Sequence, residues 1–176
     1  RGAAILTTTY GVGELSAING VMGAKAHRLP VFHLVGMPSA RIQHLGLITH
    51  HNLGDTRYDR YQPISAQAAC VSAVLRPDNC IDELERVIRE ALRQSMPAYI
   101  VIPEADGYLP VIGTPVSGTP LAQIKRQRSD PGELAAATAA VLGRLASAAR
   151  PVALVTALTA RYGVAGKAAA LVVKTG

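Results

Sequence analysis

The sequence predicts an α/β fold with a parallel sheet built from β-α-β units, followed by the start of a second α/β domain. Short apolar runs of strand length alternate with longer segments whose apolar residues recur at helical spacing. Hydrophobic residues make up 49% of the 176 residues and charged residues 17%, so the chain can bury a sizeable core. Only 4% of the residues are aromatic, so this core must consist mainly of Ala, Val, Leu and Ile.

The first 36 residues follow a strand–helix–strand order. The apolar and β-branched run of residues 3–8 predicts a buried strand, which ends at the turn-forming Gly11 and Gly13. Residues 14–28 predict a helix that Pro30 stops, and the apolar run that follows predicts a second strand. This order predicts two parallel strands joined by a crossover helix.

The middle of the chain begins with a polar, His-rich connection over residues 39–62, in which we expect one helical turn. Connections of this length in compact domains are often functional. The Ala- and Val-rich residues 64–75 then predict a strand and the segment that follows it. Residues 80–94 predict a helix that starts after Asn79, and residues 99–102 predict the last strand of this domain.

The remaining chain is predicted to be a linker and an incomplete second domain. We place a partial first domain at residues 1–106, a Pro- and Gly-rich linker at 107–129 and the start of a central α/β domain at 130–176. In this last part we expect a helix capped by Asp130, a strand over residues 152–155 and a further helix. The chain is thus expected to be a piece of a longer polypeptide.

The net charge of +6 comes from the C-terminal part alone. Residues 1–124 contain ten basic and ten acidic residues, whereas residues 125–176 contain eight basic and two acidic ones. A nucleic-acid surface would need a basic face with aromatic residues, and only Tyr162 is aromatic there, so we predict no nucleic-acid partner. The longest uncharged run contains several Pro and Gly, which argues against a membrane helix. Two cysteines without metal-ligand spacing indicate reduced thiols and a cytoplasmic protein.

The first candidate site is the turn Gly11-x-Gly13-x-x-Ser16 between a strand and a helix. The spacing is close to a dinucleotide fingerprint, but the third position is Ser, and no acidic residue ends the second predicted strand. A tight turn that needs the backbone freedom of glycine explains the same pattern. The carboxyl end of a strand in an open α/β sheet is in either case a usual place for a ligand.

The second candidate site is the histidine pair of the long connection, His50 and His51. Three interpretations remain open from spacing alone. Together with Asp55 the pair offers three zinc ligands. As loop residues the two histidines can also be a solvated surface pair. As groups that titrate near neutral pH, they are suited to acid/base catalysis.

These two segments together resemble thiamine-diphosphate-dependent 2-keto acid decarboxylases, a family that includes pyruvate and indolepyruvate decarboxylases. Residues 8–20, Thr-Thr-Tyr-Gly-Val-Gly-Glu-Leu-Ser-Ala-Ile-Asn-Gly, resemble the strand-turn-helix of the family. Residues 50–54, His-His-Asn-Leu-Gly, resemble its paired-histidine motif. The match is collinear over about residues 3–110, and from Asp130 the predicted elements fit the start of the family's middle domain.

The resemblance implies a pyrimidine-binding first domain and a non-oxidative decarboxylase that converts a 2-keto acid to an aldehyde and CO₂. It places Thr9, Gly11, Val12 and Gly13 in the pyrimidine pocket, and it gives the two histidines proton-transfer roles. Thiamine diphosphate would act as the electron sink. The resemblance also implies Mg²⁺, whose ligands and the diphosphate-binding residues are expected outside this chain, and a homodimer or homotetramer.

Two features of the family do not occur in the chain. The glutamate that hydrogen-bonds the pyrimidine precedes the segment that matches residue 1, and Glu14 is not expected to replace it. The Gly-Asp-Gly…Asn motif that binds diphosphate and metal is also absent from the sequence. We therefore expect the isolated chain to be inactive. The alternatives are a non-catalytic binding or assembly module and a Rossmann-type nucleotide-binding protein. The sequence does not indicate which 2-keto acid is used.

Overall fold

The computed structural model describes residues 2–113 and 128–175, and the chain divides into two compact units, residues 2–126 and 127–176. The predicted α/β class with a parallel sheet is confirmed in the first unit. Most of the predicted linker, residues 114–127, lies outside the described residues.

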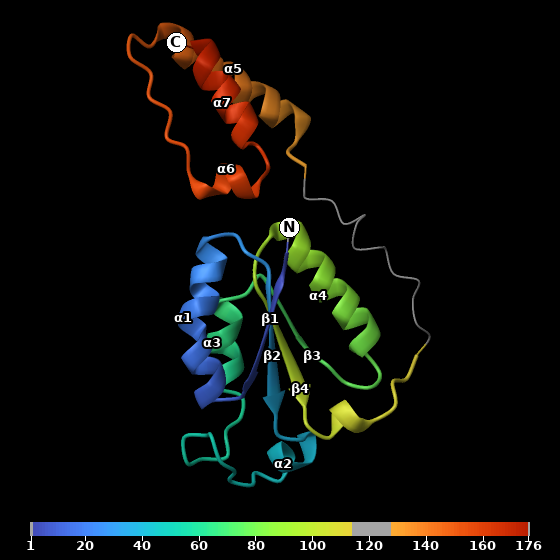
Figure 1. Cartoon of the computed structure of the whole chain (residues 1–176). Coiled ribbons are helices and arrows are strands. Elements are labelled where there is room, and N and C mark those ends of the chain that lie inside the picture. The colour runs from blue at the N-terminus through green and yellow to red at the C-terminus, as the bar shows by residue number, and fades with distance from the viewer. Residues whose placement is uncertain (1, 114–127, 176) are drawn as a thin grey trace. The chain divides into compact units, whose positions relative to one another are not determined.

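The sheet of the first unit has four parallel strands among the described residues: β1 (Ala4–Thr9), β2 (Val31–Met37), β3 (Val71–Val74) and β4 (Ala98–Pro103). Their order across the sheet is β1-β2-β4-β3 (Figure 1). Each pair keeps one register along its length. All four carboxyl ends therefore meet at one edge of the sheet, which is where the predicted turn and the long connection follow β1 and β2.

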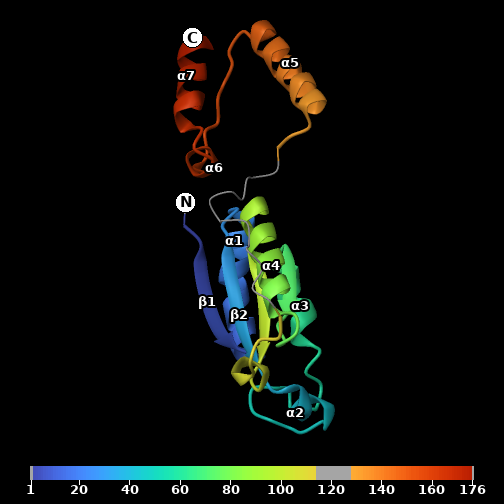
Figure 2. The same cartoon turned by 90° about the vertical axis from the view of Figure 1, so that its right-hand side faces the viewer.

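Helices cover both faces of this sheet. Helix α1 (Val12–Ala26) and helix α3 (Tyr61–Gln67) lie on one face, and α4 (Cys80–Gln94) lies on the other (Figures 1 and 2). The short helix α2 (Ala40–His44) and a 3-10 turn, η1 (Asp106–Tyr108), follow the carboxyl ends of β2 and β4. The predicted helices of residues 14–28 and 80–94 are confirmed within a few residues.

The hydrophobic core has one cluster on each face. The cluster beneath α1 and α3 contains four tyrosines and carries most of the aromatic residues of the chain, while the buried members of the cluster beneath α4 are all aliphatic. The buried members of the first cluster are Tyr10, Val35, Met37, Tyr58, Tyr61, Ala69, Tyr99 and Val101. The expectation of a core built mainly of aliphatic residues thus holds on one face only, because the aromatic residues gather beside the candidate site.

Two predictions for the first unit are wrong in part. Residues 64–75 begin with helix α3 rather than with a strand, and only the last part forms β3. Pro63 lies in the first turn of α3, where a backbone N–H would have no partner inside the helix, so proline is tolerated there. Strand β1 is an edge strand in the described sheet and is not buried, since it pairs only with β2 and Ile5 is 73% exposed.

The second unit contains three helices among its described residues: α5 (Pro131–Ser147), α6 (Ala157–Arg161) and α7 (Ala165–Thr175). Asp130 caps α5 as expected, because its Oδ1 atom accepts a hydrogen bond from the N–H of Glu133 at 2.9 Å. The strand predicted at residues 152–155 is wrong: these residues form no strand, and Val152 is 92% exposed. A strand needs a neighbouring strand, and the described part of this unit offers none.

Within the part of the chain that the structure describes, no helix is both long enough and apolar enough to cross a membrane.

Candidate functional site

The turn after β1 is shaped by a glycine that no other residue can replace without strain. Gly11 is buried and has φ 58°, in the left-handed region that favours glycine. A Cβ atom at this position would lie 2.0 Å from the carbonyl oxygen of His51 and 3.3 Å from the Tyr61 ring. Because Gly11 has no side chain, the backbone of the long connection can pack closely against the turn. This role differs from allowing a cofactor ring to approach the backbone.

The structure brings the two candidate segments together. Nδ1 of His51 lies 3.2 Å from Oγ1 of Thr9, and His51 itself adopts φ 63°. The rings of His50 and His51 meet edge to face with their centroids 4.3 Å apart. Both histidines are exposed. The pair is therefore held at the end of β1, with its rings accessible to a ligand.

A chain of hydroxyl groups fixes the backbone that carries the histidines. The Tyr10 hydroxyl donates to the His50 carbonyl oxygen and lies 2.7 Å from the Thr49 hydroxyl. Thr49 in turn is 2.9 Å from the Tyr58 hydroxyl, which donates to the Leu47 carbonyl oxygen at 2.6 Å. Because Tyr10 and Tyr58 are buried in the core, their hydroxyl groups anchor the loop to the core.

The zinc interpretation of the histidine pair receives no support from Asp55. Its carboxylate binds the Arg60 guanidinium at 2.7 Å and accepts a hydrogen bond from the N–H of Arg57 at 3.0 Å. Among residues 2–113 and 128–175, no group of three or more His, Cys, Asp or Glu side chains is placed to hold a metal ion. Cys70 and Cys80 are both free thiols.

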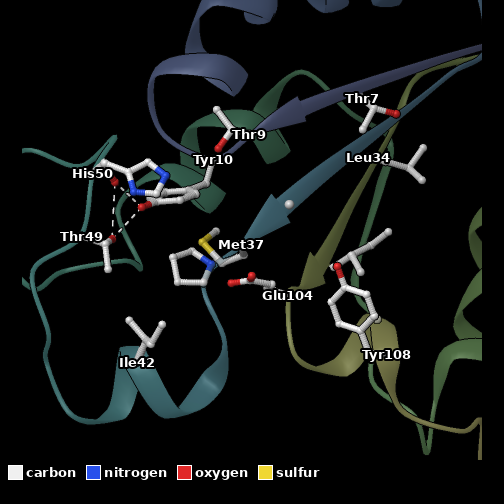
Figure 3. A pocket seen from close by; sticks show the side chains of 14 residues that line it. Thr7, Thr9, Tyr10, Leu34, Met37, Ile42, Thr49, His50, Glu104 and Tyr108 are labelled. Carbon is white, nitrogen blue, oxygen red and sulfur yellow. Dashed lines mark hydrogen bonds between the residues drawn. The ribbon is translucent and has the colours of Figure 1, made fainter.

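A pocket of about 650 Å³ lies at the carboxyl ends of β1, β2 and β4 (Figure 3). Thr49, Tyr10 and His50 stand on one side of it and Tyr108 on the other (Figure 3). Its lining residues are Thr7, Thr9, Tyr10, Leu34, Gly36, Met37, Pro38, Ile42, Thr49, His50, Ile102, Glu104, Gly107 and Tyr108. The surface of the pocket is mostly apolar, and its ionisable side chains are those of His50, Glu104 and two tyrosines, Tyr10 and Tyr108.

The predicted site residues are distributed unevenly around this pocket. Thr9 and His50 line it, whereas Gly11, Val12, Gly13 and His51 are not among its lining residues. Val12 is nevertheless 53% exposed at the start of α1. A Cβ atom on Gly13 would lie 2.7 Å from the methyl carbon of Thr9, so this second glycine allows the turn to pack on β1.

The sequence analysis did not identify two residues that line the pocket, nor the structural role of Glu14 beside the turn. Glu104 and Tyr108 reach the pocket from the segment after β4, which was assigned to the end of the domain and the linker, and no motif marks them. Glu14 is fully buried beside the turn, with Oε1 2.9 Å from the Gly11 N–H. A signal for Glu14 existed, because a glutamate three residues after a helix N-cap is the second half of a capping box.

One buried histidine lies beneath the site. His33 on β2 is 2% exposed, and its Nε2 atom lies 2.9 Å from the Thr8 hydroxyl. Its ring meets the Tyr99 ring edge-on. Burial lowers the pKa of His33 below the usual 6.5, and the nearby Glu14 opposes this effect only in part. The His33 ring is therefore neutral at physiological pH and acts as a packing residue.

Curated proteins similar to this chain are known from yeast and mycobacteria. Thiamine metabolism regulatory protein of Saccharomyces cerevisiae is 32% identical over 92% of the chain. Alpha-keto-acid decarboxylases of Mycobacterium avium and Mycobacterium tuberculosis are 41% and 38% identical over 58% of it. These relatives confirm the resemblance to 2-keto acid decarboxylases. The chain spans 26% of the yeast relative and 18% of each mycobacterial one. No family model matches the chain.

The decarboxylase resemblance gives the turn and the histidine loop a common explanation. A dinucleotide fingerprint would explain the glycines but not the histidine loop whose backbone packs against Gly11. The relatives therefore favour the decarboxylase interpretation of Gly11 and Gly13 over the Rossmann-type one.

The residues of the pocket fit part of thiamine diphosphate. The apolar walls of the pocket and the side chains of Thr9 and His50 suit a flat heteroaromatic ring with polar edges. For the diphosphate and Mg²⁺ the described residues provide no group of carboxylates or other metal ligands. The described pocket therefore suits a ring of this kind, and the described residues offer no metal site beside it.

Proposed function

We propose that this chain is part of a thiamine-diphosphate- and Mg²⁺-dependent decarboxylase that converts a 2-keto acid to an aldehyde and CO₂. The observation that carries the proposal is the contact of Thr9 with His51, which joins the turn and the histidine pair that define the resemblance. The alpha-keto-acid decarboxylases among the relatives support the same reaction. The proposed protein is a cytoplasmic homodimer or homotetramer, and the isolated chain is proposed to be inactive.

In this proposal the chain holds the pyrimidine end of the cofactor. Thr9 and Val12 would contact the ring from the end of β1 and the start of α1, and Gly11 and Gly13 would shape the turn between them. Bound thiamine diphosphate supplies the electron sink for decarboxylation. The apolar part of the pocket wall would pack against the ring.

His50 and His51 are proposed to move protons during the reaction. Both rings are exposed beside the pocket, and the backbone that carries them is fixed by Tyr10 and Thr49. Histidine is the side chain that most often serves as a general acid or base in proteins. Two adjacent imidazoles of fixed orientation can therefore deliver a proton to a substrate carbon or oxygen on the pocket side.

The test uses the longer protein that contains this chain. We expect 2-keto acid turnover with thiamine diphosphate and Mg²⁺, and a loss of about 10²–10⁴-fold in kcat for His50→Ala or His51→Ala. Cofactor affinity should change little. The matched control is His44→Ala, an exposed histidine at the end of α2 that does not line the pocket. Wild-type protein without turnover, or mutants with unchanged kcat, would contradict the proposal.

A second candidate function is a regulatory protein that retains the fold without catalysis. It is favoured by the yeast relative, which matches 92% of the chain and is described as a regulator of thiamine metabolism. The same assay separates the two functions. A regulator would bind thiamine diphosphate, as followed by calorimetry, and release no aldehyde from any 2-keto acid.

A further inference from the structure

Glu14 is an acidic residue with no exposed surface, and its carboxyl group is fully engaged. Oε1 accepts a hydrogen bond from the backbone N–H of Gly11 at 2.9 Å. Oε2 accepts hydrogen bonds from the Ser65 hydroxyl at 2.5 Å and from the Tyr99 hydroxyl at 2.8 Å. All three partners donate, which is the arrangement that an ionised carboxylate satisfies, since it is an acceptor only.

The hydroxyl groups of Ser65 and Tyr99 act as hydrogen-bond donors to Glu14 in a buried environment. Burial and the adjacent Glu14 raise the pKa of Tyr99 far above its usual value, so its phenol keeps its proton and donates it. Ser65 is 3% exposed and lies in α3. A buried carboxylate is costly unless its donors remain in place. Glu14 therefore fixes the positions of the turn, of α3 and of β4 relative to one another.

The turn that Glu14 holds is the one that supports the histidine pair. The N–H of Gly11 binds Glu14, while the opposite side of Gly11 contacts the carbonyl oxygen of His51. Two residues before Gly11, the Thr9 hydroxyl lies 3.2 Å from the His51 ring. A displacement of Gly11 would change its packing on the His51 backbone, and it would act on the nearby Thr9 through the chain. Glu14 itself does not line the pocket, so it cannot touch a ligand there.

We propose that Glu14 is a positioning residue of the candidate active site, which holds Gly11 and through it places His51. The catalytic part of this inference rests on the proposed function, whereas the placement of His51 does not. The role differs from that of a glutamate that contacts the cofactor, because Glu14 acts only through the backbone of the turn.

Placement is tested by nuclear magnetic resonance on the 176-residue chain. The readouts are the His51 ring resonances and the amide exchange rate of Gly11 divided by that of the core residue Val35. Glu14→Met removes both acceptor oxygens, and Glu14→Asp keeps the charge but is one methylene shorter. Glu14→Gln keeps an acceptor within reach of Gly11. The matched control, Tyr99→Phe, removes one donor to the carboxylate and leaves the bond to Gly11.

We expect Glu14→Met and Glu14→Asp to raise the exchange ratio by about tenfold or more and to shift the His51 resonances. Glu14→Gln and Tyr99→Phe should stay within about threefold of the wild-type ratio. The proposal is overturned if Glu14→Asp behaves like Glu14→Gln, or if Tyr99→Phe shifts the His51 resonances as much as Glu14→Asp does. Glu14→Asp retains a buried carboxylate, so it decides the question if Glu14→Met does not fold.

Turnover in the longer protein then tests the catalytic consequence. Glu14→Asp should lower kcat by about 10²-fold, because a misplacement of about 1 Å has that effect on a catalytic group. KM should change much less, and the Glu14→Gln variant should retain most of the wild-type kcat. If the wild-type protein shows no turnover, the proposed function fails while the resonance data still decide the placement. If turnover is normal in Glu14→Asp, the catalytic part of the inference is wrong.

Discussion

The carbonyl oxygen of His51 lies 2.0 Å from the point that a Cβ atom on Gly11 would occupy. This relationship joins two segments that are forty residues apart in the sequence. It makes the glycine of the turn a structural requirement for the histidine loop, independent of any cofactor. Its effect on stability can therefore be measured on the chain alone.

Gly11→Ala should destabilise the first unit by at least about 2 kcal/mol, because it combines a left-handed φ with a backbone clash. Urea unfolding followed by circular dichroism measures the change. The control is Gly20→Ala in the interior of α1, where an added Cβ meets no atom within 4 Å. This control should raise the stability by about 0.5–1 kcal/mol. Equal effects of the two substitutions would show that His51 does not pack on the turn.

Tyr10→Phe should loosen the histidine loop. The substitution removes the hydroxyl that contacts Thr49 and the His50 carbonyl oxygen, and it should cost about 1–3 kcal/mol. Trypsin should cut faster after Arg57, which is exposed in the same loop. Tyr108→Phe serves as the control because Tyr108 is 86% exposed. Unchanged cleavage after Arg57 in Tyr10→Phe would mean that the hydroxyl chain does not hold the loop.

The parts of the fold that were predicted correctly are those in which local pattern decides the structure. Residues 80–94 show helical spacing of apolar residues between clear boundaries, and the structure has the helix at those residues. The exposure of Ile5 on β1 could not be predicted, because it depends on the order of the strands across the sheet. Strand order follows from contacts between distant residues, which leave no local signal.

Helix α3 shows a different limit. Its residues from Pro63 onward include no charged group, so no charged face marks a helical period, and the Ala-rich run continues into β3. The strand predicted at residues 152–155 failed for a related reason, since an apolar run shows only a tendency to be buried. A run of this kind becomes a strand when a partner strand is present.

The two segments of the candidate site could be identified from the sequence, but their arrangement in space could not. Resemblance to the decarboxylases selected the turn and the histidine pair, and the structure places Thr9 beside His51. The hydroxyl chain through Thr49 and the burial of Glu14 depend on side chains that meet only in the folded state. Spacing along the chain carries no information about such contacts.

His33 should make the stability of the first unit depend on pH. Burial lowers the pKa of His33 in the folded state, so below about pH 6.5 the unfolded chain takes up a proton that the folded chain does not. The free energy of unfolding should therefore fall as the pH decreases from 6.5 towards the lowered pKa. Urea midpoints measured between about pH 8 and pH 5 follow this change.

His33→Gln should flatten that pH dependence, because glutamine does not titrate. The exposed histidine His44 provides the matched control, and His44→Gln should retain the slope of the wild-type chain. The attribution to His33 is wrong if the His33→Gln chain loses stability on acidification as steeply as the wild type.

Asp130→Ala should destabilise helix α5 in the second unit by about 1 kcal/mol, because it removes the side-chain acceptor of the Glu133 N–H. The helix buries little surface among the described residues, so its first turn depends strongly on this cap. The measurement is amide exchange at Glu133 and Leu134, which should accelerate by about fivefold. The control is Thr138→Ala, an exposed position inside the same helix where alanine has the higher helix propensity. This control should leave exchange at the first turn unchanged or slower. If Asp130→Ala has no more effect than Thr138→Ala, packing rather than capping holds the start of α5.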